Sequence, residues 1–102
     1  IIMSNMHLYI IQSSNNGCFK VGRSINPERR LKQLQTGNPY SLKIVLTLSG
    51  MGHREKSIHN FIMINGKKKC KGEWFEYDKM ACLPDDVYEK LNLDEVNFWW
   101  NH

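Results

Sequence analysis

The sequence of 102 residues lacks paired cysteines and long apolar runs. Its cysteines, Cys18, Cys70 and Cys82, are odd in number and show no C-x-x-C spacing, so we expect neither a disulfide framework nor a zinc knuckle. No apolar stretch approaches the roughly 20 residues of a membrane helix, and no secretory signal is visible. These absences favour a reducing, intracellular compartment (host cytoplasm or nucleus if the chain is viral), so we expect a protein that is neither secreted nor bound to a membrane.

Acidic residues are scarce in the centre of the chain. The first 19 residues carry no charged side chain, whereas residues 20–71 hold twelve basic residues against only Glu28 and Glu55, a net charge of +10. Residues 72–102 are acidic, with a net charge of −6. The basic segment is suited to phosphate backbones. A solvated lysine-rich surface is the alternative interpretation.

The pattern of apolar residues predicts one small folded domain, as expected for 41% hydrophobic and 24% charged residues. Apolar runs at 7–11 and 18–22 flank a polar segment that ends in Asn16-Gly17 and predict a β-hairpin. Asn26 and Pro27 suit the N-cap and first position of a helix over residues 27–36.

The second half of the pattern predicts one more strand and two more helices. Residues 42–48 are apolar on both faces and predict a strand at the centre of the sheet. Residues 53–64 predict a helix with Ile58, Phe61 and Ile62 facing inward. Residues 73–77 suggest a short strand or docking segment, and a third helix begins near Pro84. The predicted fold class is α+β, with a small three-stranded sheet flanked by helices.

Several short motifs in this order resemble the GIY-YIG nuclease superfamily. His7-Leu8-Tyr9 corresponds to the first motif and Lys20-Val21-Gly22 to the second. The run from Arg23 to Pro39 and the later Gly72-Glu73-Trp74-Phe75 are typical of a short branch found in viruses, phages and some bacteria and fungi. The resemblance covers roughly residues 8–77. It implies a unit over residues 3–78, on which we expect an acidic helix and aromatic tail, residues 79–102, to pack.

The resemblance implies a DNA endonuclease that hydrolyses phosphodiester bonds with Mg²⁺ or Mn²⁺. Arg30 corresponds to the catalytic arginine, and its planar guanidinium suits phosphate oxygens. The conserved glutamate of the superfamily lies on the helix that carries Glu55, which is the candidate metal ligand; a lone carboxylate often holds Mg²⁺ together with waters. Tyr9 would act as general base or position the water, and we expect Tyr9, Arg30 and Glu55 to gather over one surface of the sheet. Each of these residues also has an ordinary structural interpretation, as a surface charge or a core aromatic.

The sequence departs from the superfamily pattern at three places. Lys20 stands where tyrosine is common, His7 where glycine is usual, and Trp74-Phe75 occupies the region of a downstream asparagine. These departures leave open whether Tyr9 or Lys20 accepts the proton. They also motivate an alternative, a non-catalytic nucleic-acid-binding module on the same scaffold.

The remaining candidates are residues near the predicted site. His59, one helical turn after Glu55, is a catalytic or a structural histidine, and its spacing is not that of a zinc hydrolase. Arg23, Lys32 and the lysine loop 67–71 are candidate phosphate contacts, which position a duplex without reading its sequence. No known DNA-reading motif is present, so we expect low sequence specificity. A third interpretation is a small interaction domain working through Trp99-Trp100. The oligomeric state is not predicted.

Overall fold

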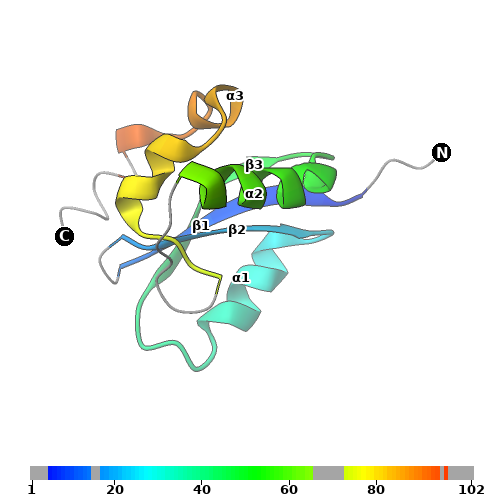
Figure 1. Ribbon diagram of the computed structural model, residues 1–102. Helices are drawn as coiled ribbons and strands as arrows, with labels where there is room; N and C mark the ends of the chain where they lie inside the picture. The colour runs from blue at the N-terminus through cyan, green and yellow to red at the C-terminus, as the bar shows by residue number, and fades with distance from the viewer. Residues whose placement is uncertain (1–4, 15–16, 66–72, 95, 97–102) are drawn as a thin grey trace.

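A three-stranded antiparallel sheet forms the middle layer of the molecule. The computed structural model describes residues 5–14, 17–65, 73–94 and 96. Strands β1 (His7–Ser13), β2 (Phe19–Ser24) and β3 (Leu42–Leu48) pair in the order β2-β1-β3. Figure 1 shows α1 on one face of the sheet and α2 on the other. The predicted α+β fold class and the predicted N-terminal hairpin are therefore confirmed.

The prediction that residues 42–48 form the central strand is wrong. The central strand is β1, in which every residue from Leu8 to Ser13 is buried, whereas β3 lies at one edge and is only partly buried. Helices cover both faces of this edge strand: Ile44 packs in the cluster that includes α1, and Leu46 packs on the other side. Apolar residues on both faces of a strand therefore do not distinguish a central strand from a covered edge strand.

Helix α1 (Pro27–Gln35) begins and ends as predicted. The Asn26 side chain accepts a hydrogen bond from the Arg29 backbone N–H at 3.1 Å, and Pro27 is buried at the first position. Gly37 follows the helix with a φ of 78°, in the left-handed region where glycine is favoured. Leu31 and Leu34 of α1 pack on a buried cluster formed by Tyr9, Ile11 and Leu42. The cap and the apolar spacing thus fix α1 on one face of the sheet.

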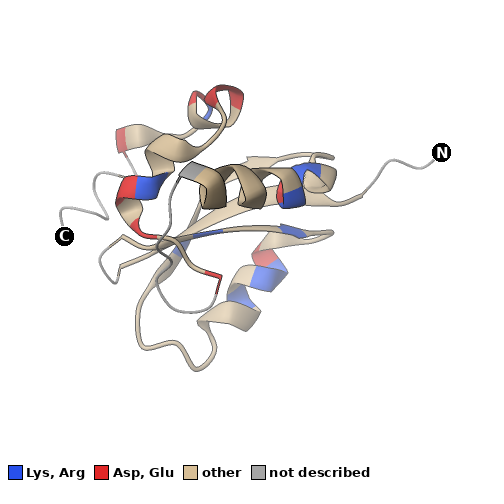
Figure 2. Cartoon of the chain, viewed as in Figure 1, with Lys and Arg blue, Asp and Glu red and all other residues tan. Residues whose placement is uncertain are grey.

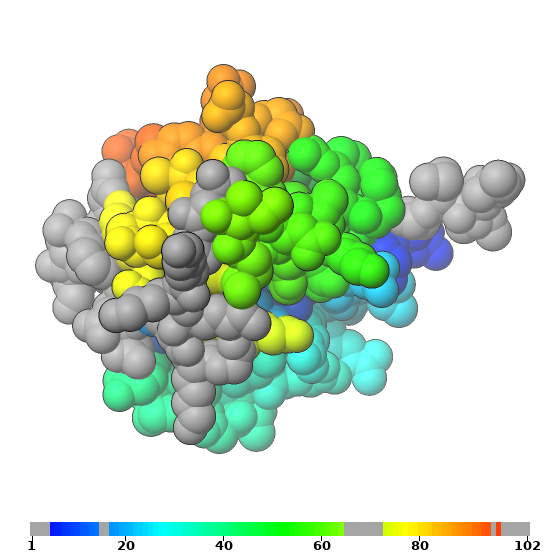
Figure 3. Space-filling model, in the orientation of Figure 1, coloured from blue at the N-terminus to red at the C-terminus, as the bar shows by residue number. Residues whose placement is uncertain are grey.

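The opposite face of the sheet carries the larger core. The 3-10 helix η1 (Gly52–Arg54) leads into α2 (Glu55–Asn65), whose Ile58 and Ile62 are fully buried. Phe61, by contrast, is 43% exposed, so the prediction that it faces inward is wrong. It lies three residues after Ile58 but at the margin of the buried stripe. The 3-10 helix η2 (Tyr77–Cys82) and α3 (Asp85–Tyr88) complete this layer, and Figure 3 shows α2 and α3 on the side of the molecule opposite α1.

Apolar residues of the acidic C-terminal region join this larger core. Met80, Leu83, Val87, Leu91 and Val96 are buried in the same cluster as Ile10 and Val21 of the sheet. The segment before η2 is attached by a short bridge: Phe19 and Phe75 exchange backbone hydrogen bonds of 2.8 and 2.7 Å, and their rings lie 5.7 Å apart. The predicted docking segment over residues 73–77 thus pairs with the start of β2.

The cysteines depart from expectation in one respect. Cys18, which is buried directly before β2, is disulfide-bonded. The expectation that no disulfide forms is therefore wrong for Cys18, because an odd number of cysteines does not exclude a single bridge. The lysine loop 67–71 and Trp99-Trp100 lie outside the described residues. Within the described ranges, no helix has the length and apolar character needed to cross a membrane.

Candidate functional site

Basic residues gather at one end of the sheet. Figure 2 shows Lys and Arg at the start of α1, at the start of α2 and along β2, whereas acidic residues mark η2 and α3. The start of α1 follows directly after β2, and η1 contacts both β1 and β2, so the first turns of both helices meet this end of the sheet. The candidate site therefore lies where β2, an edge strand, reaches its C-terminal end.

Arg23 and Glu55 meet at this end. The Nε atom of Arg23 lies 3.9 Å from Oε1 of Glu55, and the two side chains are 55% and 27% exposed. This distance brings opposite charges together without a hydrogen bond, and an exposed pair of this kind contributes little to stability. Glu55 opens α2, where the partial positive charge of the helix N-terminus favours an anion. Both side chains are thus available to a ligand.

His59 ties α2 to the sheet. Its Nε2 lies 2.6 Å from the carbonyl oxygen of Val21, and a carbonyl oxygen only accepts, so Nε2 carries the donated proton. The imidazole also packs edge-on against Phe75 at 5.9 Å. Because His59 lies one helical turn after Glu55, this bond sets where Glu55 stands over β2. Its Nε2 proton is already used in holding the backbone.

Tyr9 crosses the edge strand at Gly22. The two residues are partners in the β1–β2 ladder, and a Cβ placed on Gly22 would lie 2.4 Å from both Cζ and Oη of Tyr9. The ring therefore passes over β2 in the space that a side chain at position 22 would fill. Tyr9 is only 2% exposed. A glycine is therefore needed at position 22, because this ring occupies the space of its side chain.

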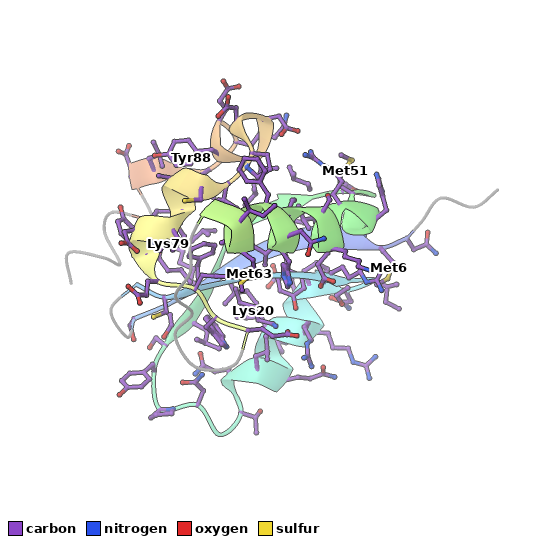
Figure 4. The ribbon with its side chains drawn as sticks, in the orientation of Figure 1. Met6, Lys20, Met51, Met63, Lys79 and Tyr88 are labelled. Carbon is purple, nitrogen blue, oxygen red and sulfur yellow. The ribbon has the colours of Figure 1, made fainter. Side chains whose placement is uncertain are left out.

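Lys20 is held by Glu73. Its Nζ donates a hydrogen bond to Oε2 of Glu73 at 2.9 Å, and the side chain of Lys20 is 10% exposed against 67% for Glu73. Figure 4 shows Lys20 beside the segment that leads into η2. Lys20 is two residues from Gly22 on the same face as Tyr9, and diagonal neighbours of this kind lie roughly 7–8 Å apart. No local sequence signal indicates this pairing, because 53 residues separate the partners.

Arg30 and Lys32 are exposed on α1. Arg30 lies in the first turn, where its backbone N–H bonds the Asn26 carbonyl at 3.0 Å, and its Nη1 lies 3.4 Å from Oε1 of Gln33. Lys32 lies two residues further along the helix. The weak Gln33 contact leaves the guanidinium of Arg30 open to phosphate.

The candidate residues lie on two faces of the sheet, not over one surface as the sequence suggested. Arg23 pairs with Leu8, and Leu8 belongs to the core on the α2 side; Tyr9 belongs to the cluster on the α1 side. Successive residues of a strand point to opposite faces. The expectation of one shared surface is therefore corrected: Arg23, Glu55 and His59 approach the edge of β2 from one side, and Tyr9, Lys20 and α1 from the other.

His7 anchors the start of β1 to the turn that leads into η1. Its Nδ1 accepts a hydrogen bond from the Gly50 backbone N–H at 3.0 Å. The Gly52 N–H bonds the Met6 carbonyl at 3.0 Å, and a Cβ on Gly52 would lie 2.6 Å from Cβ of Met6. These contacts hold the turn that leads into α2. His7, which stands where the superfamily usually has glycine, therefore helps to position Glu55 at the start of that helix.

A neighbouring ion pair holds Arg54 away from the site. Its guanidinium makes two hydrogen bonds to the carboxylate of Asp86 on α3, at 2.5 and 3.2 Å. The hydrogen bond raises the pKa of Arg54 and lowers the pKa of Asp86. Arg54 thus joins η1 to α3 and is committed there, which leaves Arg23 as the cation beside Glu55.

Among the residues that the structure describes, Glu55 is the carboxylate that lies beside Arg23 and could serve a metal ion. Within the described ranges, no group of three or more His, Cys, Asp or Glu side chains is placed to hold a metal ion. A site of the zinc kind is therefore not formed by these residues. One partly exposed carboxylate fits a hard cation such as Mg²⁺, which usually retains several waters and takes further oxygens from the substrate phosphate.

These observations define the class of protein: a small α+β domain that carries cations and a carboxylate at the end of an edge strand. Within it, the chain belongs to the T5orf172 domain family, which matches residues 6–99. This family is found in phage and bacterial proteins and is related at the superfamily level to GIY-YIG nucleases. It indicates a nuclease-like or nucleic-acid-binding module. Neither the curated proteins nor the solved structures include a match to this chain.

Proposed function

We propose that the chain is a divalent-metal-dependent DNA endonuclease with low intrinsic sequence specificity. The observation that carries the proposal is the loose Arg23–Glu55 pair at the open end of an edge strand. Glu55 is one of two acids in a segment with twelve basic residues, and its carboxylate has no close hydrogen bond to Arg23. An isolated carboxylate kept among cations suits a site that binds a metal ion and a phosphate together.

The chain's own residues supply phosphate binding at this site. Arg23 and Arg30 offer planar guanidinium groups from the two sides of β2, and a phosphodiester at the strand edge would accept hydrogen bonds from both. Glu55 would hold Mg²⁺ or Mn²⁺, which supplies a Lewis acid for the phosphate oxygens when bound. His59 keeps Glu55 in place through its bond to Val21.

Tyr9 is the residue proposed to position the attacking water. Its hydroxyl lies over Gly22, which precedes Arg23 in the strand. A tyrosine hydroxyl both donates and accepts hydrogen bonds, so it can orient a water toward a phosphate. Lys20 has no assigned role in this step, because its ammonium already donates to Glu73.

A second candidate function is a nucleic-acid-binding module without catalysis. The Lys20–Glu73 pair favours it, because the position where the superfamily commonly has tyrosine is here buried and ion-paired. Such a module would keep the phosphate contacts of Arg23, Arg30 and Lys32. It would bind nucleic acid with an affinity that falls steeply as salt rises.

Nicking of supercoiled plasmid separates the two functions. The full chain is incubated with plasmid and Mg²⁺ or Mn²⁺, with EDTA as the blank. The matched variants are Arg30→Ala and Arg29→Ala, since neighbouring residues of a helix project about 100° apart. We expect metal-dependent nicking that Arg30→Ala lowers by at least about tenfold and Arg29→Ala leaves within about twofold. Salt-sensitive binding without nicking would overturn the endonuclease and support the module.

A further inference from the structure

An apolar side chain is exposed in the middle of the cationic site. Ile25, in the bend between β2 and α1, is 67% exposed. It follows Arg23 by two residues and precedes Arg30 by five, and both of these cations are exposed. Isolated exposed apolar residues are common. An exposed isoleucine between two arginines that are proposed to bind phosphate is less common, because the arginines attract a charged ligand that an apolar side chain would not be expected to bind.

The backbone of Ile25 is fixed on both sides. The Asn26 N–H donates to Oγ of Ser24 at 2.9 Å, and Oδ1 of Asn26 caps α1. Pro27, the next residue, is buried. Isoleucine is also stiff at χ1 because it is branched at Cβ. Ile25 therefore projects from a rigid turn, and little conformational entropy is lost when it meets a ligand.

The usual structural reason for an apolar residue at this position is absent. A residue just before a helix N-cap often packs on the fourth helical residue, in the contact called a hydrophobic staple. Here the N-cap is Asn26, so the fourth residue is Arg30. Arg30 offers no apolar side chain to complete the contact, and Ile25 remains exposed. Ile25 thus stays exposed directly before the helix that carries Arg30, the proposed phosphate contact.

We infer that Ile25 is a wedge that enters the base stack of duplex DNA beside the bound phosphodiester. This inference rests on the proposed function and specifies its substrate: duplex DNA with an easily opened step, such as a pyrimidine–purine step or a mismatch. Apolar side chains of this kind unstack a base step, and the cost of unstacking is lowest where the sequence is flexible. Arg23 and Arg30 on either side favour a polyanion over an apolar protein surface as the occupant.

Unstacking is measured directly with 2-aminopurine. A short duplex carries 2-aminopurine at a TA step, and the full chain is added in EDTA so that no strand is cut. Fluorescence reports unstacking, and anisotropy of a dye on the same duplex reports binding. The variants are Ile25→Ala and Ile25→Leu. Ile64→Ala is the matched control, because Ile64 is 79% exposed near the far end of α2.

Wild type, Ile25→Leu and Ile64→Ala are expected to raise the fluorescence, and Ile25→Ala to lose at least about half of the rise. Ile25→Ala should also weaken binding to the TA or mismatched duplex by about fivefold or more, and to a GC-rich duplex by less than about twofold. Circular dichroism should be unchanged because Ile25 is exposed.

Three outcomes overturn the inference. If Ile25→Ala unstacks and binds like wild type, Ile25 is not a wedge. If wild type binds the duplex without a rise in fluorescence, the wedge is again wrong, whereas the endonuclease proposal still stands. If wild type binds no duplex and also nicks no plasmid when Mg²⁺ or Mn²⁺ is present, the proposed function fails together with the inference.

Discussion

The two ends of strand β2 are built in opposite ways. At its start, Lys20 is buried, pairs with Glu73 at 2.9 Å and lies next to the Phe19–Phe75 bridge. Arg23 lies three residues further along the strand, a distance of about 10 Å at the usual rise per residue of a β-strand. Its Nε atom lies 3.9 Å from Oε1 of Glu55, and its side chain is half exposed. The first pair makes a close hydrogen bond to a neighbouring segment, and the second makes none.

This difference separates a structural ion pair from a binding site. An ammonium that is 10% exposed needs its carboxylate, because an unpaired buried charge is costly. The Arg23–Glu55 pair is too long for a hydrogen bond, so replacing either group with water or a ligand costs little. Similar residues thus stabilise the fold at one end of β2 and remain available for phosphate and metal at the other.

The largest expected effect is on cleavage, at the open end of β2. Glu55→Gln keeps the shape of the side chain and removes its charge, so binding of a divalent ion is lost. We expect the nicking rate to fall by at least about 100-fold. This is more than the usual loss of activity when a residue that hydrogen-bonds to a metal ligand is changed. The thermal midpoint should move little, because the pair with Arg23 is weak. Nicking rate and thermal unfolding, measured on one preparation, check both statements.

The next effect is on stability, where Tyr9 crosses β2. Gly22→Ala places a methyl group 2.4 Å from the Tyr9 ring and should destabilise the fold by about 1–3 kcal/mol in urea unfolding. In a Tyr9→Leu background the same change should cost much less. Gly37→Ala is the control: nothing lies near its Cβ, so its cost comes from its positive φ alone and is the same in both backgrounds. If Gly22→Ala lowers the free energy of unfolding equally in the two backgrounds, the contact with the Tyr9 ring is not the cause of the loss.

A smaller loss of stability is expected at the closed end of β2. Glu73→Gln leaves the Lys20 ammonium with a neutral partner and should cost about 1 kcal/mol, since Glu73 itself is largely exposed. Adding Lys20→Met removes the charge that lacks a partner and should restore the loss. Chemical denaturation of the single and double variants measures this. A double variant that is less stable than Glu73→Gln alone would show that the pair is not the cause.

The smallest effect is on the pH dependence of the exposed Arg54–Asp86 pair. Arg54 lowers the pKa of Asp86, so the stabilisation is complete above the ordinary aspartate pKa of about 3.9 and is lost as the pH falls through the lower folded value. The thermal midpoint of wild type should exceed that of Asp86→Asn at pH 6, and the difference should shrink as the pH falls below the ordinary aspartate pKa. A difference that persists at the acid end would contradict this assignment.

Local sequence signals predicted most of the elements. The Asn26-Pro27 start of α1 and the two strands of the hairpin are set by residues close in the chain, and all were predicted. The order of strands was not, because it depends on which strand both helices cover. Phe61 has the spacing of an inward residue, yet its exposure depends on how far the C-terminal region extends over α2.

The candidate site, like the fold, was predicted from local sequence only in part. The residues around it were found from motif spacing, but their distribution over two faces depends on the register of the hairpin. Once Tyr9 is paired with Gly22, strand alternation sends Arg23 to the opposite face. The Lys20–Glu73 pair depends on the fold bringing distant segments together.

The same substitution, glutamate to glutamine, made beside each end of β2 tests the central claim most directly. Plasmid nicking and the thermal midpoint are measured for Glu55→Gln and Glu73→Gln, which make the same chemical change at the open and closed ends. We predict that Glu55→Gln abolishes nicking at an unchanged midpoint, and that Glu73→Gln lowers the midpoint while nicking persists at a temperature where the protein is folded. Normal nicking by a folded Glu55→Gln protein would contradict the assignment of the site to the open end of β2.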